Sequence, residues 1–211
     1  LLRDTLDKLE NINRWLGGNK VTVNGLKKLL KNHSKEEEIT IIDIGCGHGD
    51  ILRDVAKFGR KQHYKFKLVG IDANPTAIKY ANELSINYPE LSFETQDIFS
   101  ETFKKREFDV VLATLFLHHF KEKQLISFLE STSKQAKKGI VVNDLHRHKL
   151  AYYLFMLLSL FIKNKMIVND GLISVLRGFK HKELVELSQK ISVQPHISWK
   201  WAFRFLWIIK K

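Results

Sequence analysis

Three glycines alternate with other residues directly after an apolar run, at Gly45, Gly47 and Gly49 of the segment DIGCGHG. Because glycine has no Cβ, the chain can turn tightly there and a ligand can approach the backbone closely. The start of a following helix would present free N–H groups at the same place. The dinucleotide-binding fingerprint would have its third glycine at residue 50, where this chain has Asp50. The spacing therefore disfavours NAD as the ligand.

Acidic residues end or follow three predicted strands, at Asp43, Asp72 and Asp97. A carboxylate at Asp72 can accept both hydroxyl hydrogens of a ribose. Asp97 can accept from an adenine amino group while the Ile98 N–H donates to a ring nitrogen. Three carboxylates around one crevice suit a ligand with a cationic amino-acid part, a ribose and an adenine, and they would repel a pyrophosphate. Taken singly, Asp72 could instead cap the next helix, and Asp97 could be a turn residue.

The elements that must position these residues alternate between strand and helix. Apolar, β-branched runs predict strands, and the segments between them have helical character. Alternation at this spacing implies a parallel sheet with helices on both faces. The predicted strands are 39–45, 66–72, 91–96, 108–114 and 139–145, and the predicted helices are 50–60, a helix after 74–75, and 121–137.

Both ends of the chain add elements to this core. Apolar residues at helical spacing predict a helix over 2–16 and a second over 23–31. The apolar stretch 150–162 is too short to span a bilayer, so it is interpreted as a buried or interfacial helix. A loop is expected around Asn169–Gly171, then a helix over 180–190 and strands over 191–197 and 198–209. We expect one domain over 1–211, divided into N-terminal helices (1–38), a ligand-binding core (39–145), a helical lid or insertion (146–190) and the last two strands (191–211).

The order DIGCGHG, VGIDANP, TQDIF and FDVVLATLFLHHF resembles the class I S-adenosylmethionine-dependent methyltransferases over roughly residues 39–145. The resemblance implies an α/β, Rossmann-like, doubly wound and mostly parallel seven-stranded sheet, with S-adenosylmethionine as the cofactor. Cys46 is then a small filler among the glycines more readily than a nucleophile. The implied cofactor-binding residues are Asp43, Gly45, Cys46, Gly47 and Gly49 near the methionine part, Asp72 and Ala73 near the ribose, Asp97 and Ile98 near the adenine, and Ala113 and Thr114 beside the sulfonium.

A general base is needed only if the methyl acceptor is a protonated oxygen or an acidic carbon. His119 follows the fourth strand, and Asp144 and His146 lie at the end of the fifth, where open α/β sheets place substrate-facing residues. We expect these three to be catalytic, although the histidine could pack and Asp144 could cap the next helix. Residues 113–116 read ATLF, not the Asn-Pro-Pro-Tyr-like motif typical of enzymes that methylate bases or glutamine. No metal site is predicted.

The lid helix, with Tyr152, Tyr153, Phe155 and Met156, suits a small lipophilic or aromatic acceptor, free or bound to a carrier. The segments INRWLGG, VVNDLHRH and DGLISVLRGF resemble methyltransferases of quinone and polyketide biosynthesis. We therefore expect methylation of an oxygen, or a carbon, of such an acceptor. The alternatives are an RNA-binding methyltransferase and a non-catalytic module that binds S-adenosylmethionine.

Most of the net positive charge lies in the C-terminal part of the chain. Of the formal charge of +12, residues 121–211 contribute +11, from 17 Lys and Arg against 6 Asp and Glu. Such a surface attracts nucleic acid or anionic membrane. The aromatic residues at alternate positions 199–207 are better explained as the core and edge of a sheet than as a platform for stacking bases, so nucleic acid is disfavoured as a partner. Lys149, Lys163 and Lys165 favour a peripheral membrane contact, and a single cysteine favours the cytoplasm.

Overall fold

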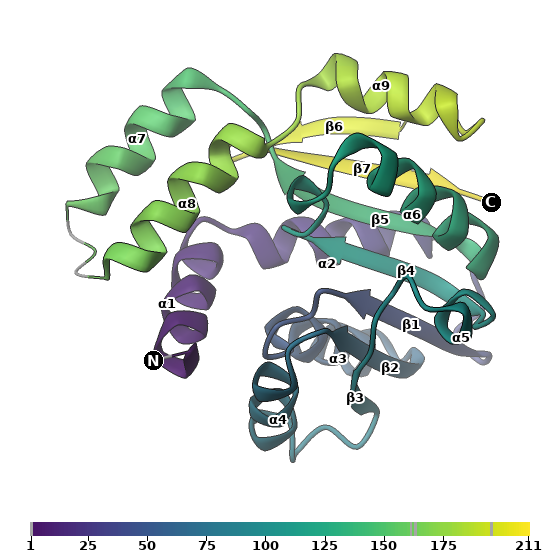
Figure 1. The fold of residues 1–211 in the computed structure, drawn as a ribbon. Helices are drawn as coiled ribbons and strands as arrows, with labels where there is room; N and C mark the ends of the chain where they lie inside the picture. The colour runs from purple at the N-terminus through teal and green to yellow at the C-terminus, as the bar shows by residue number, and fades with distance from the viewer. Residues whose placement is uncertain (1, 161, 163, 195) are drawn as a thin grey trace.

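A seven-stranded sheet forms the middle layer of the protein in its computed structural model, which describes residues 2–160, 162, 164–194 and 196–211. The strands are β1 Glu38–Ile44, β2 Lys65–Asp72, β3 Leu91–Thr95, β4 Phe108–Thr114, β5 Ala136–Leu145, β6 His196–Lys200 and β7 Arg204–Lys210. They lie in the order β3-β2-β1-β4-β5-β7-β6 (Figure 1). The pairs β1–β2, β1–β4, β2–β3 and β4–β5 are parallel, whereas β7 is antiparallel to β5 and β6.

Helices cover both faces of this sheet, because its central strands are apolar on both sides. In β1, Ile41 packs into one hydrophobic core and its neighbour Ile42 into the other. The helices are α1 Leu2–Trp15, α2 Gly18–Leu29, α3 Asp50–Gln62, α4 Pro75–Leu84, α5 Glu101–Lys104, the 3₁₀ helix η1 Leu117–His119, α6 Glu122–Gln135, α7 Lys149–Ser159, α8 Lys165–Arg177 and α9 His181–Lys190. Helices α2 and α3 close the first core, and α5, α6 and α9 close the second.

The predicted fold class is confirmed: the sheet is mostly parallel and doubly wound, with N-terminal helices and a helical insertion after the fifth strand. The chain runs from β1 to β2 and β3 on one side, then returns to β4 on the other side of β1. Ligands of such sheets bind where the winding reverses, outside the carboxyl ends of the strands. Helix α1 and the α7–α8 pair stand at that end of the sheet (Figure 1).

Helix α8 corrects the prediction of a loop around Asn169–Gly171. These residues lie inside one continuous helix. Asparagine, aspartate and glycine have low helix propensity. Gly171, however, faces the ring of Phe155 on α7, and a Cβ on Gly171 would lie 2.3 Å from the Cζ of that ring. The glycine therefore allows α7 and α8 to pack closely, and this tertiary contact overrides the local preference for a turn.

The second helix and the last two strands also have different boundaries from those predicted. Helix α2 begins at Gly18, after Gly17 in the left-handed conformation (φ 73°), so the glycine pair both ends α1 and starts α2. Strand β6 begins at residue 196, and 201–203 form the turn into β7. Of the aromatics in this region, Phe205 and Trp207 are buried in the core, as the sheet-core role requires. Trp199 and Trp201 are 51% and 72% exposed, which corrects a core role for these two.

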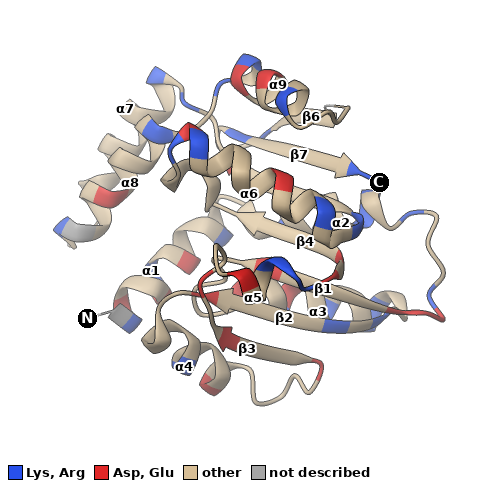
Figure 2. Ribbon diagram, turned by 45° about the vertical axis from the view of Figure 1, so that its right-hand side comes forward, with Lys and Arg blue, Asp and Glu red and all other residues tan. Residues whose placement is uncertain are grey.

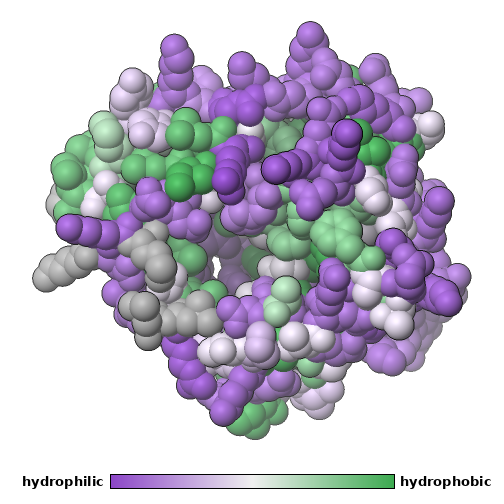
Figure 3. Space-filling view, viewed as in Figure 1, coloured by the Kyte–Doolittle hydropathy of each residue, from purple (hydrophilic) through white to green (hydrophobic). Residues whose placement is uncertain are grey.

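Helix α7 is exposed, which corrects the buried alternative for the apolar stretch 150–162. Ala151 is the buried residue of α7, and several leucines of this helix face solvent. Basic residues lie at both ends of the α7–α8 pair, blue in Figure 2, and an apolar surface covers the same region in Figure 3. Part of the stretch, Phe161, and the predicted membrane-facing Lys163 lie outside the described residues. Within the described part of the chain, every helix is too short or too polar to cross a bilayer.

Candidate active site

The glycine segment after β1 forms a tight turn that only glycine can follow without strain. Gly45, Gly47 and Gly49 all have positive φ, between 54° and 80°. A Cβ on Gly45 would lie 2.2 Å from the ring of Phe116, and one on Gly49 would lie 2.5 Å from the ring of Phe93. The turn is held against β2, because the N–H of Gly45 donates to the Ile71 carbonyl at 2.8 Å. Gly45 and Gly49 thus make room for these two rings, whereas a Cβ on Gly47 would have its nearest neighbour, Leu6, at 3.8 Å, so the turn is open to a ligand at Gly47.

Asp72 and Asp97 lie at the carboxyl ends of β2 and β3 and are held by backbone N–H groups. The Oδ2 of Asp72 accepts from the Gly47 N–H at 3.0 Å, and its Oδ1 accepts from the Asn74 N–H at 2.8 Å. The cap of α4 is Asn74, so the helix-capping alternative for Asp72 is wrong. The Oδ1 of Asp97 accepts from the Phe99 N–H at 2.9 Å, as the turn alternative requires. A turn of this kind leaves the other oxygen, Oδ2, able to accept from a ligand.

Two cavities meet at Gly45. The first, of about 220 Å³, lies between Asp72 and Asp97 and is walled by aromatic rings. Two of these rings, Phe116 and Phe120, pack edge to face with centroids 4.9 Å apart. The second cavity, of about 130 Å³, lies above Asp43. The predicted cofactor residues lining the first are Gly45, Asp72, Ala73, Asp97 and Ile98, and those lining the second are Asp43, Gly45, Cys46, Gly47 and Thr114.

Asp43 brings a buried carboxyl group to the second cavity. It is 2% exposed, and its Oδ1 has no hydrogen-bond partner among the described residues. Burial, together with the neighbouring carboxylates of Asp50 and Asp72, raises the pKa of Asp43 well above its ordinary value. A cation placed beside this group would offset the burial and stabilise the carboxylate. The cavity is therefore suited to the positively charged part of a ligand.

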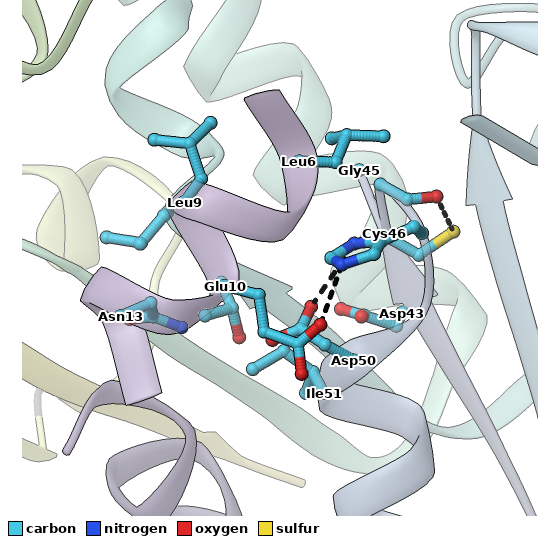
Figure 4. Close-up of a pocket in the computed structure, with 13 residues that line it drawn as sticks. Leu6, Leu9, Glu10, Asn13, Asp43, Gly45, Cys46, Asp50 and Ile51 are labelled. Atoms are coloured by element: carbon cyan, nitrogen blue, oxygen red, sulfur yellow. Dashed lines mark hydrogen bonds and ion pairs between the residues drawn. The ribbon is translucent and has the colours of Figure 1, made fainter. Parts of the chain in front are cut away.

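Helix α1 forms one wall of the second cavity, which the sequence analysis missed. Leu6, Leu9, Glu10 and Asn13 line it from α1, opposite Asp43 (Figure 4). Their spacing of three, four and seven residues places them on one face of a helix, and this pattern was the available signal.

Polar contacts hold α1 against the glycine turn. The Nε2 of His48 lies 2.8 Å from the Oε2 of Glu10, and the guanidinium of Arg53 donates to the His48 carbonyl at 2.6 Å. A second contact joins α1 to α4, where the Tyr80 hydroxyl donates to Asp7 at 2.9 Å. Side-chain hydrogen bonds and ion pairs thus attach α1 to the glycine turn and to α4.

Two predicted cofactor residues lie outside the lining of both cavities. Ala113 is fully buried in the sheet core, one residue before Thr114. Gly49 lies at the start of α3, against Phe93. The Oγ1 of Thr114 is 2.9 Å from that of Thr22 on α2, which orients it beside the second cavity. Contact of any of these residues with a cofactor stays a prediction.

Asp144 holds the η1 turn at the end of β5. Its Oδ2 accepts from the Leu117 N–H at 2.9 Å, and its Oδ1 lies 2.6 Å from the Nδ1 of His118. The side chains of His118 and Asp144 are both 2% exposed. Asp144 therefore organises the turn that carries His119. The helix cap next to it is His148, whose Nδ1 accepts from the Leu150 N–H, so Asp144 does not cap α7.

His119 and His146 are separate candidates for a base. His119 is exposed on η1, its ring centroid 4.2 Å from that of His118, and α8 packs against this turn. Desolvation, and then the neighbouring His118, lower the pKa of His119, while the charge of Asp170 on α8 opposes this. Burial, and then His148, lower the pKa of His146. Both rings therefore favour the neutral form, but their catalytic parts stay predictions.

Comparison with known proteins adds independent findings. A family model described as a methyltransferase domain matches residues 35–167. A protein named as an N5-glutamine methyltransferase of Methanocaldococcus jannaschii is 33% identical over 128 residues, which are 60% of this chain and 61% of that protein. A ubiquinone biosynthesis O-methyltransferase of Rickettsia bellii is 28% identical over 153 residues, which are 68% of this chain and 58% of that protein. This chain spans less than two thirds of either relative.

The fold has a close match among solved structures. The structure of the plantazolicin methyltransferase BpumL in complex with SAH superposes with a TM-score of 0.75 at 18% identity. The superposition covers 99% of this chain and 90% of BpumL. It therefore includes the N-terminal helices and the helical insertion as well as the sheet.

Proposed function

We propose that this chain, which belongs to the class I S-adenosylmethionine-dependent methyltransferases, transfers the methyl group of S-adenosylmethionine to a small lipophilic or aromatic acceptor. The acceptor atom is an oxygen or a carbon. The observation that carries the cofactor assignment is the set of three carboxyl groups, Asp43, Asp72 and Asp97, around two cavities that meet at Gly45.

Each carboxyl group has a distinct partner in this proposal. The free oxygen of buried Asp43 faces the cationic amino-acid part of the cofactor, because an unpaired carboxyl group gains most from a positive charge. Asp72 receives the ribose hydroxyls, and Asp97 with the Ile98 N–H receives the adenine edge. The rings of Phe116 and Phe120 supply an apolar wall for the flat base. Gly45, which lines both cavities, and Thr114 would then hold the sulfonium part of the cofactor.

The cofactor supplies an activated methyl group, and the chain supplies position and a base. Alignment of the acceptor with the sulfonium lowers the barrier, by up to about 7–11 kcal/mol in well-oriented systems. When the acceptor is a hydroxyl, its oxygen forms the new bond to carbon, the bond from carbon to sulfur breaks, and the hydroxyl proton goes to His119. A lowered pKa keeps His119 neutral and able to accept this proton. Asp144 acts as a positioning residue, because it holds His118 and the turn beneath His119.

The acceptor binds between η1 and α8. Ile173 and Leu176 are 37% and 55% exposed, so α8, which packs against the turn that carries His119, offers apolar surface to an acceptor. Segment 113–116 lacks the Asn-Pro-Pro-Tyr-like motif expected for glutamine methylation, although one relative carries that activity in its name. The relative named for ubiquinone biosynthesis supports an oxygen of a lipophilic aromatic compound.

Calorimetric titration with S-adenosylmethionine, and separately with NAD, tests the cofactor assignment. We expect binding of S-adenosylmethionine alone, weakened at least about tenfold by Asp72→Ala, because each hydrogen bond to a charged group contributes about 1.5–3 kcal/mol. Glu107→Ala is the matched control, since Glu107 is exposed and pairs with Lys137 away from the cavities. Binding of NAD, or of neither compound to folded protein, would contradict the proposal.

A further inference from the structure

Helix α7 presents an apolar face to solvent that no described residue covers. Leu150, Tyr153, Leu154, Leu157 and Leu160 are between 48% and 76% exposed. Their spacing of three and four residues places them on one face of the helix. The opposite face packs on α8, where the ring of Phe155 lies against Gly171. An exposed leucine face of this kind marks an interaction surface.

The charges on α7 and at the start of α8 are of one sign. Residues 145–169 contain no acidic residue. Arg147 pairs with Glu183, whereas Lys149 and Lys165 are exposed and make no ion pair with the described part of the chain. A contact between two copies of the chain through this face would bring the same lysines together, because a twofold interface pairs a patch with itself. The occupant of the face is therefore anionic and apolar at once.

We propose that α7 docks on the surface of an anionic lipid bilayer. The leucine face enters the boundary between headgroups and acyl chains, and Lys149 and Lys165 lie among the anionic headgroups. The helix has 11 residues, so it lies in the interface and does not cross the bilayer. Apolar burial and electrostatic attraction then act together, and each alone gives weaker binding.

This placement gives the exposed helix a role in substrate supply, which rests on the proposed function. Helix α8 packs against both α7 and η1. Helix α8 therefore connects the docking surface on α7 with the turn that carries His119. In this proposal a lipophilic acceptor leaves the bilayer at α7 and reaches η1 along α8. Leu176 adds exposed apolar surface to α8.

Vesicle flotation with the full chain tests the docking surface. The vesicles contain phosphatidylcholine alone, or phosphatidylcholine with about 30% phosphatidylglycerol, in about 50 mM and about 500 mM NaCl. We expect the chain to float with the anionic vesicles and to be released by salt. Leu154→Gln with Leu157→Gln should weaken partitioning at least about tenfold, and Lys149→Gln with Lys165→Gln about tenfold or more.

Matched controls separate docking from general changes in hydropathy, charge or folding. Ile86 is 81% exposed after α4, so Ile86→Gln removes apolar surface elsewhere and should leave flotation unchanged. Lys79 is exposed on α4, so Lys79→Gln removes a positive charge elsewhere on the surface and should also leave flotation unchanged. Circular dichroism checks that every variant is folded.

Three outcomes would overturn the docking proposal. The first is that the chain does not float with anionic vesicles, and the second is that the leucine variant floats as well as the parent. The third is that the parent does not bind vesicles but forms a dimer in light scattering, and that the leucine variant abolishes this dimer. Vesicle binding is independent of methyl transfer. Loss of flotation with intact S-adenosylmethionine binding would therefore remove the membrane surface and leave the proposed function standing.

Discussion

At the residue scale, the three carboxyl groups at the strand ends differ in what already binds them. Asp72 accepts from two backbone N–H groups and Asp97 from one, whereas the Oδ1 of Asp43 has no partner among the described residues. Burial raises the pKa of Asp43, so this group most needs a positive charge beside it. Recognition of charge is thus concentrated at Asp43, while Asp72 and Asp97 suit hydroxyl and amino groups.

Gly45→Ala should lower both stability and cofactor binding. A Cβ there would lie 2.2 Å from the ring of Phe116, inside the place where the two cavities meet. Gly17→Ala is the matched control, because Gly17 has the same φ of 73° and nothing within 4 Å of its Cβ position. Both variants incur a left-handed backbone cost of about 1–2 kcal/mol. We expect urea denaturation to show that Gly45→Ala lowers the free energy of unfolding by about 1–3 kcal/mol more than Gly17→Ala does. Equal losses would mean that the contact with Phe116 does not matter.

The rate of methyl transfer to a hydroxyl acceptor should depend on pH through His119. Its pKa is lowered, so the neutral base is present above a value that lies below the ordinary one of about 6.5. We expect kcat/KM to be constant at higher pH and to fall about tenfold per unit below that pKa. His119→Gln should reduce kcat/KM by about 10²–10⁴ and remove this acidic limb. An unchanged acidic limb in His119→Gln would assign the proton to another group, with His146 the next to test.

Asp144→Ala should destabilise the fold, in contrast to a change at His119. The substitution leaves buried His118 and three backbone N–H groups without their acceptor. Loss of one partner of a buried pair costs about 3–5 kcal/mol. His119→Ala is the control, because an exposed side chain contributes within about 0.5 kcal/mol. Urea denaturation measures the free energy of unfolding of both variants. A decrease of under about 1 kcal/mol for Asp144→Ala would argue against a positioning role for Asp144.

At the element scale, α1 is a wall that side-chain pairs hold in place. The apolar periodicity predicts the helix itself over 2–16, and the structure has it at Leu2–Trp15. Its place over the second cavity was not predicted, because Glu10 and His48 are 38 residues apart and their contact depends on the finished fold. The same limit explains α8, where Gly171 is a turn signal in sequence and a packing site against Phe155 in the structure. Local patterns predict elements, and long-range contacts decide how those elements join.

Glu10→Gln should loosen α1 and weaken cofactor binding. The change keeps the length of the side chain but removes the charge that faces His48 and Arg53. We expect faster amide hydrogen exchange in α1 and about three- to tenfold weaker binding of S-adenosylmethionine, from the loss of about 1 kcal/mol. Asp4→Asn removes a charge from the same helix, where Asp4 forms an exposed ion pair with Lys8. This control should change neither the amide exchange of α1 nor the binding of S-adenosylmethionine. Unchanged exchange in Glu10→Gln would mean that apolar contacts of Leu6 and Leu9 hold the wall.

At the scale of the whole molecule, the alternation of strands and helices predicts the architecture, because right-handed parallel crossovers allow few topologies. The residues that we propose to bind the cofactor can also be predicted from the sequence, since most of them lie at the carboxyl ends of the strands that position them. The acceptor half does not. It depends on how η1, α8 and the end of β5 meet, and Asp144 and His119 lie 25 residues apart in sequence at that junction.

Binding of S-adenosylmethionine should therefore stabilise the molecule as a whole, because one ligand would contact β1, β2, β3 and α1 together. A ligand at 100 times its dissociation constant adds about 2.7 kcal/mol to the free energy of unfolding. For a chain of this size we expect Tm to rise by about 5–10 °C, measured by scanning calorimetry or intrinsic fluorescence. NAD at the same concentration should leave Tm unchanged, and Asp72→Ala should remove most of the shift. An equal shift with NAD would mean that the cavities accept a pyrophosphate, which the three carboxyl groups should repel.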